Sequence, residues 1–290
     1  MLSERLQASF DKLRKKREEY ALLPSIGERK LIDGVDCILH IPDKSSKNMP
    51  LFIELHGGAW VGGDAVMVDS LCRSISQKTP CVAVNINYKK LDIHPFPYPM
   101  EEVITVINHF RAHAEKYGID PDKIVICGQS AGSHIAAGAA VLAKNRSIPL
   151  ARQILVYPFL DFTGVHYNIL PENKTKEEAE QINRLYFGDL DMAEVFLSPA
   201  VANEKDLAGI APADIIICTK DELRSHGFGY YEKLKGMGVD VTLKEYPNAV
   251  HGFLEVNRDD YIAAGDARSL EQAIYTEDCE NYIIDIMKKI

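Results

Sequence analysis

The 290-residue sequence lacks any uninterrupted apolar run of the length needed to span a bilayer. Its first residues, from Met1 to Arg5, carry charge at once, and no apolar core of a signal peptide follows them. The sequence therefore predicts a protein that acts in the cytoplasm, without a membrane partner.

Positive charge is also scarce relative to negative charge. Lys and Arg total 33 residues against 42 for Asp and Glu, which gives a formal net charge of −9. Because a surface of this sign repels phosphate backbones, we do not expect nucleic acid as a partner.

Cysteine is present but never in the paired spacing that builds metal knuckles or redox dithiols. No C-x-x-C motif occurs, so we expect no metal site and a reducing compartment. The thiols in apolar runs are expected to pack as small hydrophobic groups. The six cysteines are Cys37, Cys72, Cys81, Cys127, Cys218 and Cys279.

Short apolar segments alternate with helical patterns along most of the chain. This alternation predicts βαβ crossovers and therefore an α/β fold, with a mainly parallel, doubly wound sheet flanked by helices in a single domain over 1–290. The Asp33-Gly34 pair predicts a hairpin between 29–32 and 37–41. Strands are expected at 51–55, 82–86, 124–127, 154–156, 215–218 and 239–245, and helices at 103–114, 131–144, 227–235 and 279–290.

One segment interrupts this rhythm. Residues 162–197 contain no strong strand, although 174–187 has a helical pattern. An insertion of this size after the carboxyl end of a strand is where a cap or lid would lie. The N-terminal segment places Leu2, Leu6 and Phe10 at helical spacing, which indicates an amphipathic helix packed on one face.

The segment Gly128-Gln129-Ser130-Ala131-Gly132 matches the G-x-S-x-G pattern of a nucleophile elbow. It follows a predicted strand and opens a predicted helix, which is the context in which this turn holds a serine hydroxyl above the sheet edge. A tight turn with an incidental serine is the structural alternative. A phosphate-binding loop is excluded because the lysine of that motif is missing.

A second glycine-rich loop, His56-Gly57-Gly58-Ala59-Trp60, follows the predicted strand 51–55. Backbone N–H groups of such a loop, together with the N–H of Ala131, can stabilise the oxyanion that develops when an acyl group is attacked. Ala59 keeps this donor because alanine has a backbone N–H. A glycine-rich turn without function is the alternative interpretation.

A serine elbow requires a histidine base and a carboxylate, which follow the serine along the chain in that fold type. His251 lies just beyond the predicted strand 239–245, and Asp221 lies just beyond 215–218. Both are expected at the sheet edge that carries Ser130. Glu222 is the alternative acid, and each of these residues could instead be a solvated loop residue. His134 is expected to be a packing or hydrogen-bonding residue.

These segments resemble the hormone-sensitive-lipase-like branch of the α/β-hydrolase superfamily, which contains bacterial carboxylesterases. The resemblance also covers Asn87-Tyr88, the stretch from His94 to Pro97, Leu197-Ser198-Pro199 and Asp221-Glu222-Leu223-Arg224. It implies a Ser130 nucleophile, an Asp221 acid and a His251 base, with oxyanion donors at Gly58, Ala59 and Ala131. It further implies a cap from about 1–22 and 162–197, and no cofactor. Three positions depart from the family pattern, namely Ala59, Gln129 and Ser133-His134.

We therefore predict a serine hydrolase that cleaves small, short-chain carboxylic esters through an acyl-enzyme on Ser130. An arylformamidase or a deacetylase of acetylxylan and other sugar esters would use the same residues. A catalytically silent ligand-binding module is the third possibility. A homodimer is possible, and the sequence does not explain Glu54 in the middle of an apolar strand.

Overall fold

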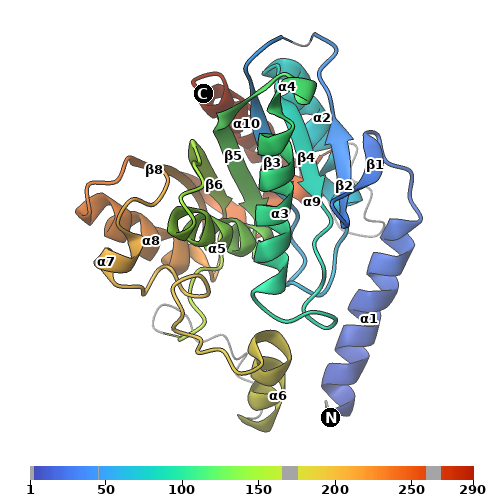
Figure 1. The fold of residues 1–290 in the computed structure, drawn as a ribbon. Coiled ribbons are helices and arrows are strands. Elements are labelled where there is room, and N and C mark those ends of the chain that lie inside the picture. Colours follow the sequence, from blue (N-terminus) through green and yellow to red (C-terminus); the bar gives the residue numbers. More distant parts are fainter. Residues whose placement is uncertain (1–2, 45, 165–175, 259–268) are drawn as a thin grey trace.

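A computed structural model describes residues 3–44, 46–164, 176–258 and 269–290. Within these residues eight strands form one sheet in the order β1-β2-β4-β3-β5-β6-β7-β8 (Figure 1). The first two strands in this order form an antiparallel hairpin that pairs antiparallel with β4, and all other neighbours are parallel. The strands are β1 (Glu28–Ile32), β2 (Val35–His40), β3 (Met49–Leu55), β4 (Val82–Ile86), β5 (Ile119–Gln129), β6 (Arg152–Val156), β7 (Ala213–Lys220) and β8 (Val241–Val250).

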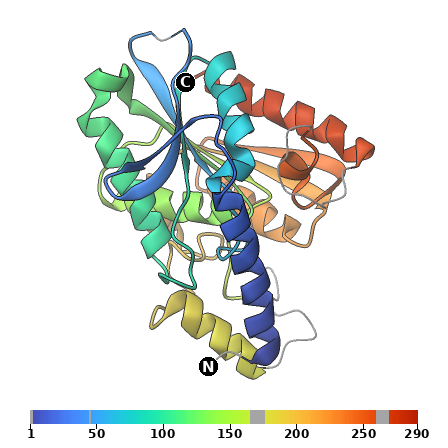
Figure 2. The ribbon, with the colours of Figure 1, turned by 90° about the vertical axis from the view of Figure 1, so that its right-hand side faces the viewer.

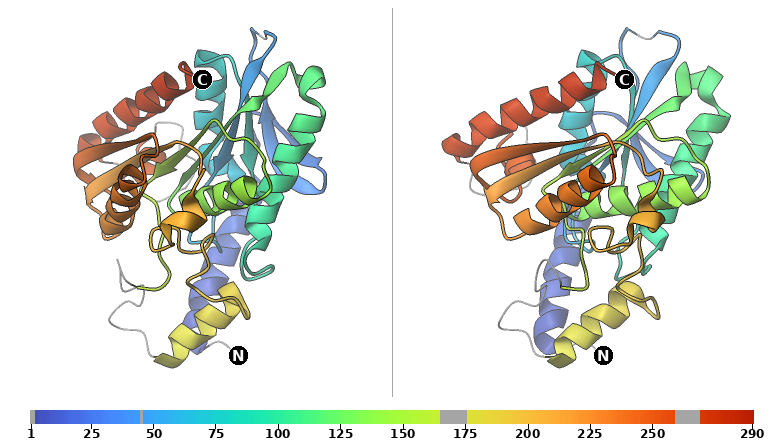
Figure 3. Two further views of the ribbon diagram at one scale, coloured as in Figure 1. Left: turned by 60° about the vertical axis from the view of Figure 1, so that its left-hand side comes forward. Right: turned by 90° about the vertical axis from the view of Figure 1, so that its left-hand side faces the viewer.

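Helices cover both faces of the sheet, which confirms the predicted doubly wound architecture. The helices α3, α5 and α8 lie on one face, and α2 and α10 lie on the other (Figures 1 and 3). The longer helices are α1 (Glu4–Ala21), α2 (Asp69–Lys78), α3 (Tyr98–Ala112), α5 (Ala131–Asn145), α6 (Lys176–Phe187), α8 (Arg224–Gly236) and α10 (Leu270–Met287). Shorter turns of helix are η1 (Ala65–Val68), α4 (Ala114–Tyr117), α7 (Glu204–Leu207) and α9 (Phe253–Val256).

Strand β3 shows why the central strands are apolar on both sides. Leu51 and Ile53 pack into the cluster beneath α3 and α5, whereas Phe52 packs into the cluster beneath α2 and α10. Successive side chains of a strand point to opposite faces, so a strand covered on both faces needs apolar residues throughout. Glu54 falls on the same face as Phe52 and is fully buried.

The hairpin forms where it was predicted. Asp33 and Gly34 connect β1 to β2 with φ angles of 48° and 87°. Both residues therefore have the positive φ that a two-residue hairpin turn requires.

Helices α2 and α10 differ most from the sequence-based prediction, while α3 begins at Tyr98 rather than at residue 103. Helix α2 was not predicted, because its buried face mixes the apolar Leu71, Cys72 and Ile75 with the polar Asp69 and Ser76. Helix α10 was expected from residue 279 but begins at Leu270, whose side chain is exposed. Its first turns carry little apolar pattern, so periodicity alone placed its start too late.

Helices α1 and α6 lie side by side at one end of the molecule (Figures 2 and 3). The backbone N–H of Ser3 donates to Oε1 of Gln181 at 2.7 Å, and the Arg5 guanidinium pairs with Glu178. The rings of Phe10 and Tyr186 meet edge to face at 6.5 Å. The predicted helix in the insertion is thus present from Lys176, while residues 165–175 lie outside the described residues. None of the described helices has the length and apolar character to cross a membrane.

Candidate active site

The turn between β5 and α5 places Ser130 at the carboxyl end of a central strand. Ser130 has φ 54° and ψ −116°, a strained conformation for a residue with a side chain. A Cβ atom at Gly128 would lie 2.4 Å from Gly132, and one at Gly132 would lie 1.9 Å from the Leu55 carbonyl oxygen. Only glycine fits at either position, so the crossing of β5, α5 and β3 explains the pattern around the serine.

His251 joins Ser130 to Asp221 through two hydrogen bonds. Its Nε2 lies 2.8 Å from Ser130 Oγ, and its Nδ1 lies 2.8 Å from Asp221 Oδ2. Asp221 directly follows β7, and His251 directly follows β8, at the carboxyl edge of the sheet that carries the serine. Since a carboxylate accepts, Nδ1 carries the proton and Nε2 is free to accept from the serine hydroxyl.

The acid and the base differ in exposure. The Asp221 side chain is 4% exposed, whereas that of His251 is 40% exposed. Burial disfavours the imidazolium, but the hydrogen bond and charge of Asp221 outweigh it, with a smaller contribution from Glu255, and raise the pKa of His251 above its usual value. His251 is therefore a stronger base than a free histidine side chain.

Tyr157 and Glu255 support the histidine from the side of the core. The Tyr157 ring meets the His251 ring at 5.0 Å, and its hydroxyl donates to the Glu255 carboxylate. Burial raises the pKa of Glu255 despite the opposing hydrogen bond from Tyr157. Neither residue has a motif that would have indicated this position, although Glu255 closely follows His251 in the sequence.

The loop after β3 lies against the nucleophile. A Cβ atom at Gly57 would lie 3.6 Å from Ser130 Cβ. Gly58 and Ala59 have φ angles of 128° and 51°. Among the described residues, no backbone carbonyl accepts from the N–H of either residue, and Ala131 is the first residue of α5, where N–H groups lack an intrahelical partner. Each of these three N–H groups therefore lacks a backbone acceptor among the residues that the structure describes.

Trp60 attaches this loop to α5. Its indole N–H donates to His134 Nδ1 at 3.2 Å, and His134 Nε2 lies 2.9 Å from the Leu197 carbonyl, to which it donates. Burial lowers the pKa of His134 to about 3, so the ring is neutral. His134 is the hydrogen-bonding residue that the sequence suggested. The rings that surround Trp60 are those of Phe96, His134, Phe159, Phe162 and Tyr186.

Buried polar groups lie behind the elbow. Burial raises the pKa of Glu54 to about 8, against smaller opposing effects of Cys127 and Gln129. At neutral pH the Glu54 carboxyl is therefore largely protonated, which explains how an acid can lie in an apolar strand. Gln129, one of the departures from the family pattern, is also fully buried.

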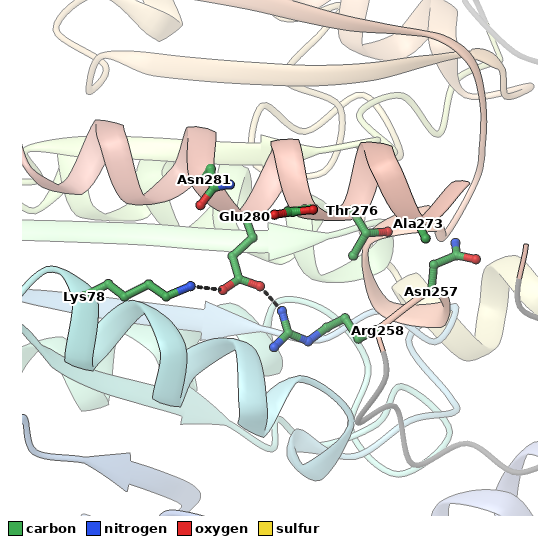
Figure 4. A pocket seen from close by; sticks show the side chains of 8 residues that line it. Lys78, Asn257, Arg258, Ala273, Thr276, Glu280 and Asn281 are labelled. Carbon is green, nitrogen blue, oxygen red and sulfur yellow. Dashed lines mark hydrogen bonds and ion pairs between the residues drawn. The ribbon is translucent and has the colours of Figure 1, made fainter. Parts of the chain in front are cut away.

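Two cavities differ in their relation to the triad of Ser130, Asp221 and His251. One of about 340 Å³ opens beside it and is lined by Lys220, Asp221, Glu222, Leu223 and His251. The other, of about 460 Å³, lies next to α10 and contains no triad residue (Figure 4). There Glu280 bridges Lys78 and Arg258.

The structure brings most of the predicted site residues together. Ser130, Asp221 and His251 are connected, and the loop from His56 to Ala59 lies beside the serine. Glu222, the alternative acid, has an exposed side chain, and it is Asp221 that bonds the histidine. Sequence reasoning did not identify Trp60, which attaches the loop after β3 to α5, nor Tyr157 and Glu255 beside the histidine. In the described parts of the chain, no three His, Cys, Asp or Glu side chains are grouped to hold a metal ion.

A mainly parallel sheet with a serine elbow after a central strand defines the α/β-hydrolase class. The α/β-hydrolase-fold family matches residues 52–255, and the chain belongs to this family. Together with the ester-hydrolase relatives described next, this match confirms the resemblance to the hormone-sensitive-lipase-like branch.

Two curated relatives come from Mycobacterium tuberculosis. The carboxylic ester hydrolase LipN is 31% identical over 220 residues, which cover 71% of this chain and 58% of LipN. The carboxylesterase NlhH is 28% identical over 260 residues, which cover 84% of this chain and 80% of NlhH. The solved esterase of Pyrobaculum calidifontis has the same fold, with a TM-score of 0.77 at 24% identity over 99% of this chain and 98% of that one.

Proposed function

We propose that the protein is a serine carboxylesterase that hydrolyses short-chain esters through an acyl-enzyme. The observation that carries the proposal is the continuous path of two 2.8 Å hydrogen bonds from Asp221 through His251 to Ser130 Oγ. In this arrangement the serine oxygen attacks the ester carbonyl while His251 Nε2 takes its proton. Asp221 keeps the proton on Nδ1 and stabilises the imidazolium.

The negative charge of the tetrahedral intermediate would be stabilised by N–H groups of Gly58, Ala59 and Ala131. His251 then returns its proton to the departing alcohol, which leaves the acyl group on Ser130. A water molecule that gives a proton to the same imidazole attacks the acyl carbon. The bond to Ser130 Oγ breaks, the carboxylic acid leaves, and His251 returns the proton to the serine oxygen. Each step uses groups of this chain, so the proposal requires no cofactor.

The relatives support an ester as the substrate, since two of them are named as ester hydrolases. The chain spans just under three fifths of LipN and four fifths of NlhH, so their activities are brought to this chain as part of the proposal. They favour ester hydrolysis over the arylformamidase and sugar-ester deacetylase alternatives. The homodimer and the cytoplasmic location stay predictions.

We include in the proposal a single domain over 1–290 whose cap is built from α1 and from the insertion that contains α6. Tyr186 of α6 supports this role, because its hydroxyl lies 3.4 Å from the Ala59 carbonyl and its own carbonyl accepts from Phe96 at 2.8 Å. Asp92 pairs with Arg14 and Arg17 of α1, so both helices contact the segments that surround the loop after β3.

The test is hydrolysis of p-nitrophenyl acetate by the wild type and by Ser130→Ala. We expect the variant to lose most of the turnover, because the nucleophile is removed while binding is retained. A fluorophosphonate probe should label the wild type and not the variant. Undiminished turnover in Ser130→Ala would overturn the proposal, and absence of an adduct on the wild type would favour a ligand-binding module.

A further inference from the structure

A lysine lies buried directly beneath the loop after β3. The Lys90 side chain belongs to a residue that is only 5% exposed, and its ammonium group lies 4.2 Å from the centroid of the Tyr88 ring. Lysine is rarely buried to this extent without partners. The buried ammonium group of Lys90 therefore needs hydrogen-bond acceptors within the protein.

Three acceptors surround Lys90 Nζ. They are His56 Nε2 at 3.0 Å, Asn87 Oδ1 at 3.0 Å and the Tyr88 carbonyl at 2.8 Å. The amide of Asn87 is oriented by its nitrogen, which donates to Asp36 at 2.8 Å and to Asp64 at 2.9 Å. An ammonium group has three protons, so it satisfies all three acceptors at once.

The histidine connects Lys90 to the peptide group next to the nucleophile. His56 Nδ1 lies 2.6 Å from the Gly57 carbonyl, which can only accept, so Nδ1 carries the proton and Nε2 accepts from Lys90. The Gly57 carbonyl and the Gly58 N–H belong to the same planar peptide unit. A hydrogen bond that fixes the direction of this carbonyl therefore also fixes the direction of the Gly58 N–H.

We propose that Lys90 is a positioning residue for the oxyanion site, which acts through His56 on the peptide unit that carries the Gly58 N–H. This inference rests on the proposed function, because it assigns the Gly58 N–H to an oxyanion. It adds a residue that the motif after β3 does not contain. Lys90 touches no reacting atom and contributes by keeping a donor aligned.

The charge of Lys90 depends on its surroundings. Burial lowers the pKa of Lys90 to about 7, with Arg17 acting in the same direction and Asp64, Glu102 and Asp36 opposing it. Burial and the charge of Lys90 also lower the pKa of His56, so the imidazole is neutral. A deprotonated Lys90 has only two N–H groups for three acceptors. Alignment of the Gly58 donor is then expected to weaken as the pH rises above neutrality.

The experiment compares Lys90→Met with Lys89→Met. Lys89 is the preceding residue and has an exposed side chain, so the same substitution there is a matched control. With p-nitrophenyl acetate we expect Lys90→Met to lower kcat by about 10- to 100-fold, less than the ~100- to 1000-fold loss that follows complete removal of an oxyanion donor. KM should stay near the wild-type value, because the donor acts mainly in the transition state.

Two further variants separate positioning from general packing. Lys90→Gln keeps two N–H donors on a side chain one bond shorter and should restore part of kcat. In a His56→Ala background, Lys90→Met should lower kcat by less than in the wild type, since the path through the imidazole is already broken. If Lys90→Met fails to fold, Lys90→Gln and its His56→Ala combination provide the same comparison.

The pH profile provides a readout that packing alone would not change. In the wild type kcat should decrease as the pH rises above neutrality. This alkaline decrease should be absent from Lys90→Met and present in Lys89→Met. A folded Lys90→Met enzyme with wild-type kcat and an unchanged alkaline decrease would overturn the inference. So would full additivity with His56→Ala. The proposed function itself fails by a different result, an active Ser130→Ala enzyme.

Discussion

The two sides of the candidate site are constructed differently. The acid and base lie at the ends of two neighbouring strands, β7 and β8, and the imidazole is 40% exposed. The loop after β3 is instead tied to buried groups, through His56 and Lys90 on one side and through Trp60 and His134 on the other. The difference follows from what each side has to do.

A group that transfers a proton must reach the substrate and water, so it cannot be enclosed. A backbone donor must keep its direction while charge develops, and this is achieved by preorganised, buried hydrogen bonds. The comparison predicts that substitution of the exposed imidazole changes the chemistry with little loss of stability. Substitutions on the buried side are expected to change both.

The largest effect is expected for His251→Ala. Removal of the base should lower kcat by up to about 10⁶-fold, because the serine hydroxyl then has no proton acceptor. The melting temperature should change little, since the side chain is partly exposed. The assay is hydrolysis of p-nitrophenyl acetate together with thermal unfolding. His113→Ala, at an exposed histidine at the end of α3, is the control and should behave as the wild type.

Asp221→Asn should have the next largest effect, about 10⁴-fold on kcat, since the amide no longer selects the Nδ1–H tautomer. Asp221 raises the pKa of His251, and only neutral His251 acts as a base. The acid limb of kcat/KM should therefore move to lower pH in the variant. Glu222→Gln is the matched control on the adjacent residue. An acid limb that stays at the wild-type pH in Asp221→Asn would contradict this role.

Trp60→Phe tests the buried side. The substitution leaves His134 Nδ1 without its donor in an enclosed site, which should destabilise the fold by about 1–3 kcal/mol and lower kcat. Denaturant unfolding measured by circular dichroism gives the first quantity, because Trp60 is the sole tryptophan and its fluorescence is lost. His134→Gln alters the same hydrogen bond, so the two changes should be less than additive in combination. Loss of activity without loss of stability would contradict this role, because Trp60 would then behave like the exposed His251.

The smallest effect on activity is expected for Glu54→Gln, beneath the elbow, where the substitution acts on stability. A carboxyl with a pKa near 8 when folded and about 4.3 when unfolded releases its proton on unfolding within this window. Glu54 therefore lowers the free energy of unfolding of the wild type as the pH rises from about 4.3 to 8. The decrease is at most ~1.4 kcal/mol per pH unit. The stability of Glu54→Gln relative to the wild type should increase with pH across this range.

Thermal unfolding at several pH values measures this difference. Glu232→Gln, at an exposed position of α8, is the control. A stability difference between Glu54→Gln and the wild type that does not vary between pH 5 and 8 would show that Glu54 is ionised when folded.

Much of the fold and of the candidate site could be predicted from the sequence, because the signals are local. Strands buried on both faces appear as short apolar runs, and the elbow requires glycine at two places where a Cβ would meet backbone. Asp221 and His251 could be selected because each follows a strand, and parallel strands bring their carboxyl ends to one edge. Helix α2 and the early start of α10 were missed because their buried faces contain few apolar residues.

The sequence by itself determined the layered fold and the chain order of nucleophile, acid and base, since these depend on periodicity and on residues within single turns. Only the tertiary structure decided what surrounds them. Lys90 directly follows Lys89, which is exposed, and nothing in the local sequence distinguishes the two lysines. Its partner His56 is 34 residues away, and Trp60 meets His134 across 74. Such hydrogen bonds exist because the folded sheet and its helices bring these side chains together, so no pattern along the chain could have revealed them.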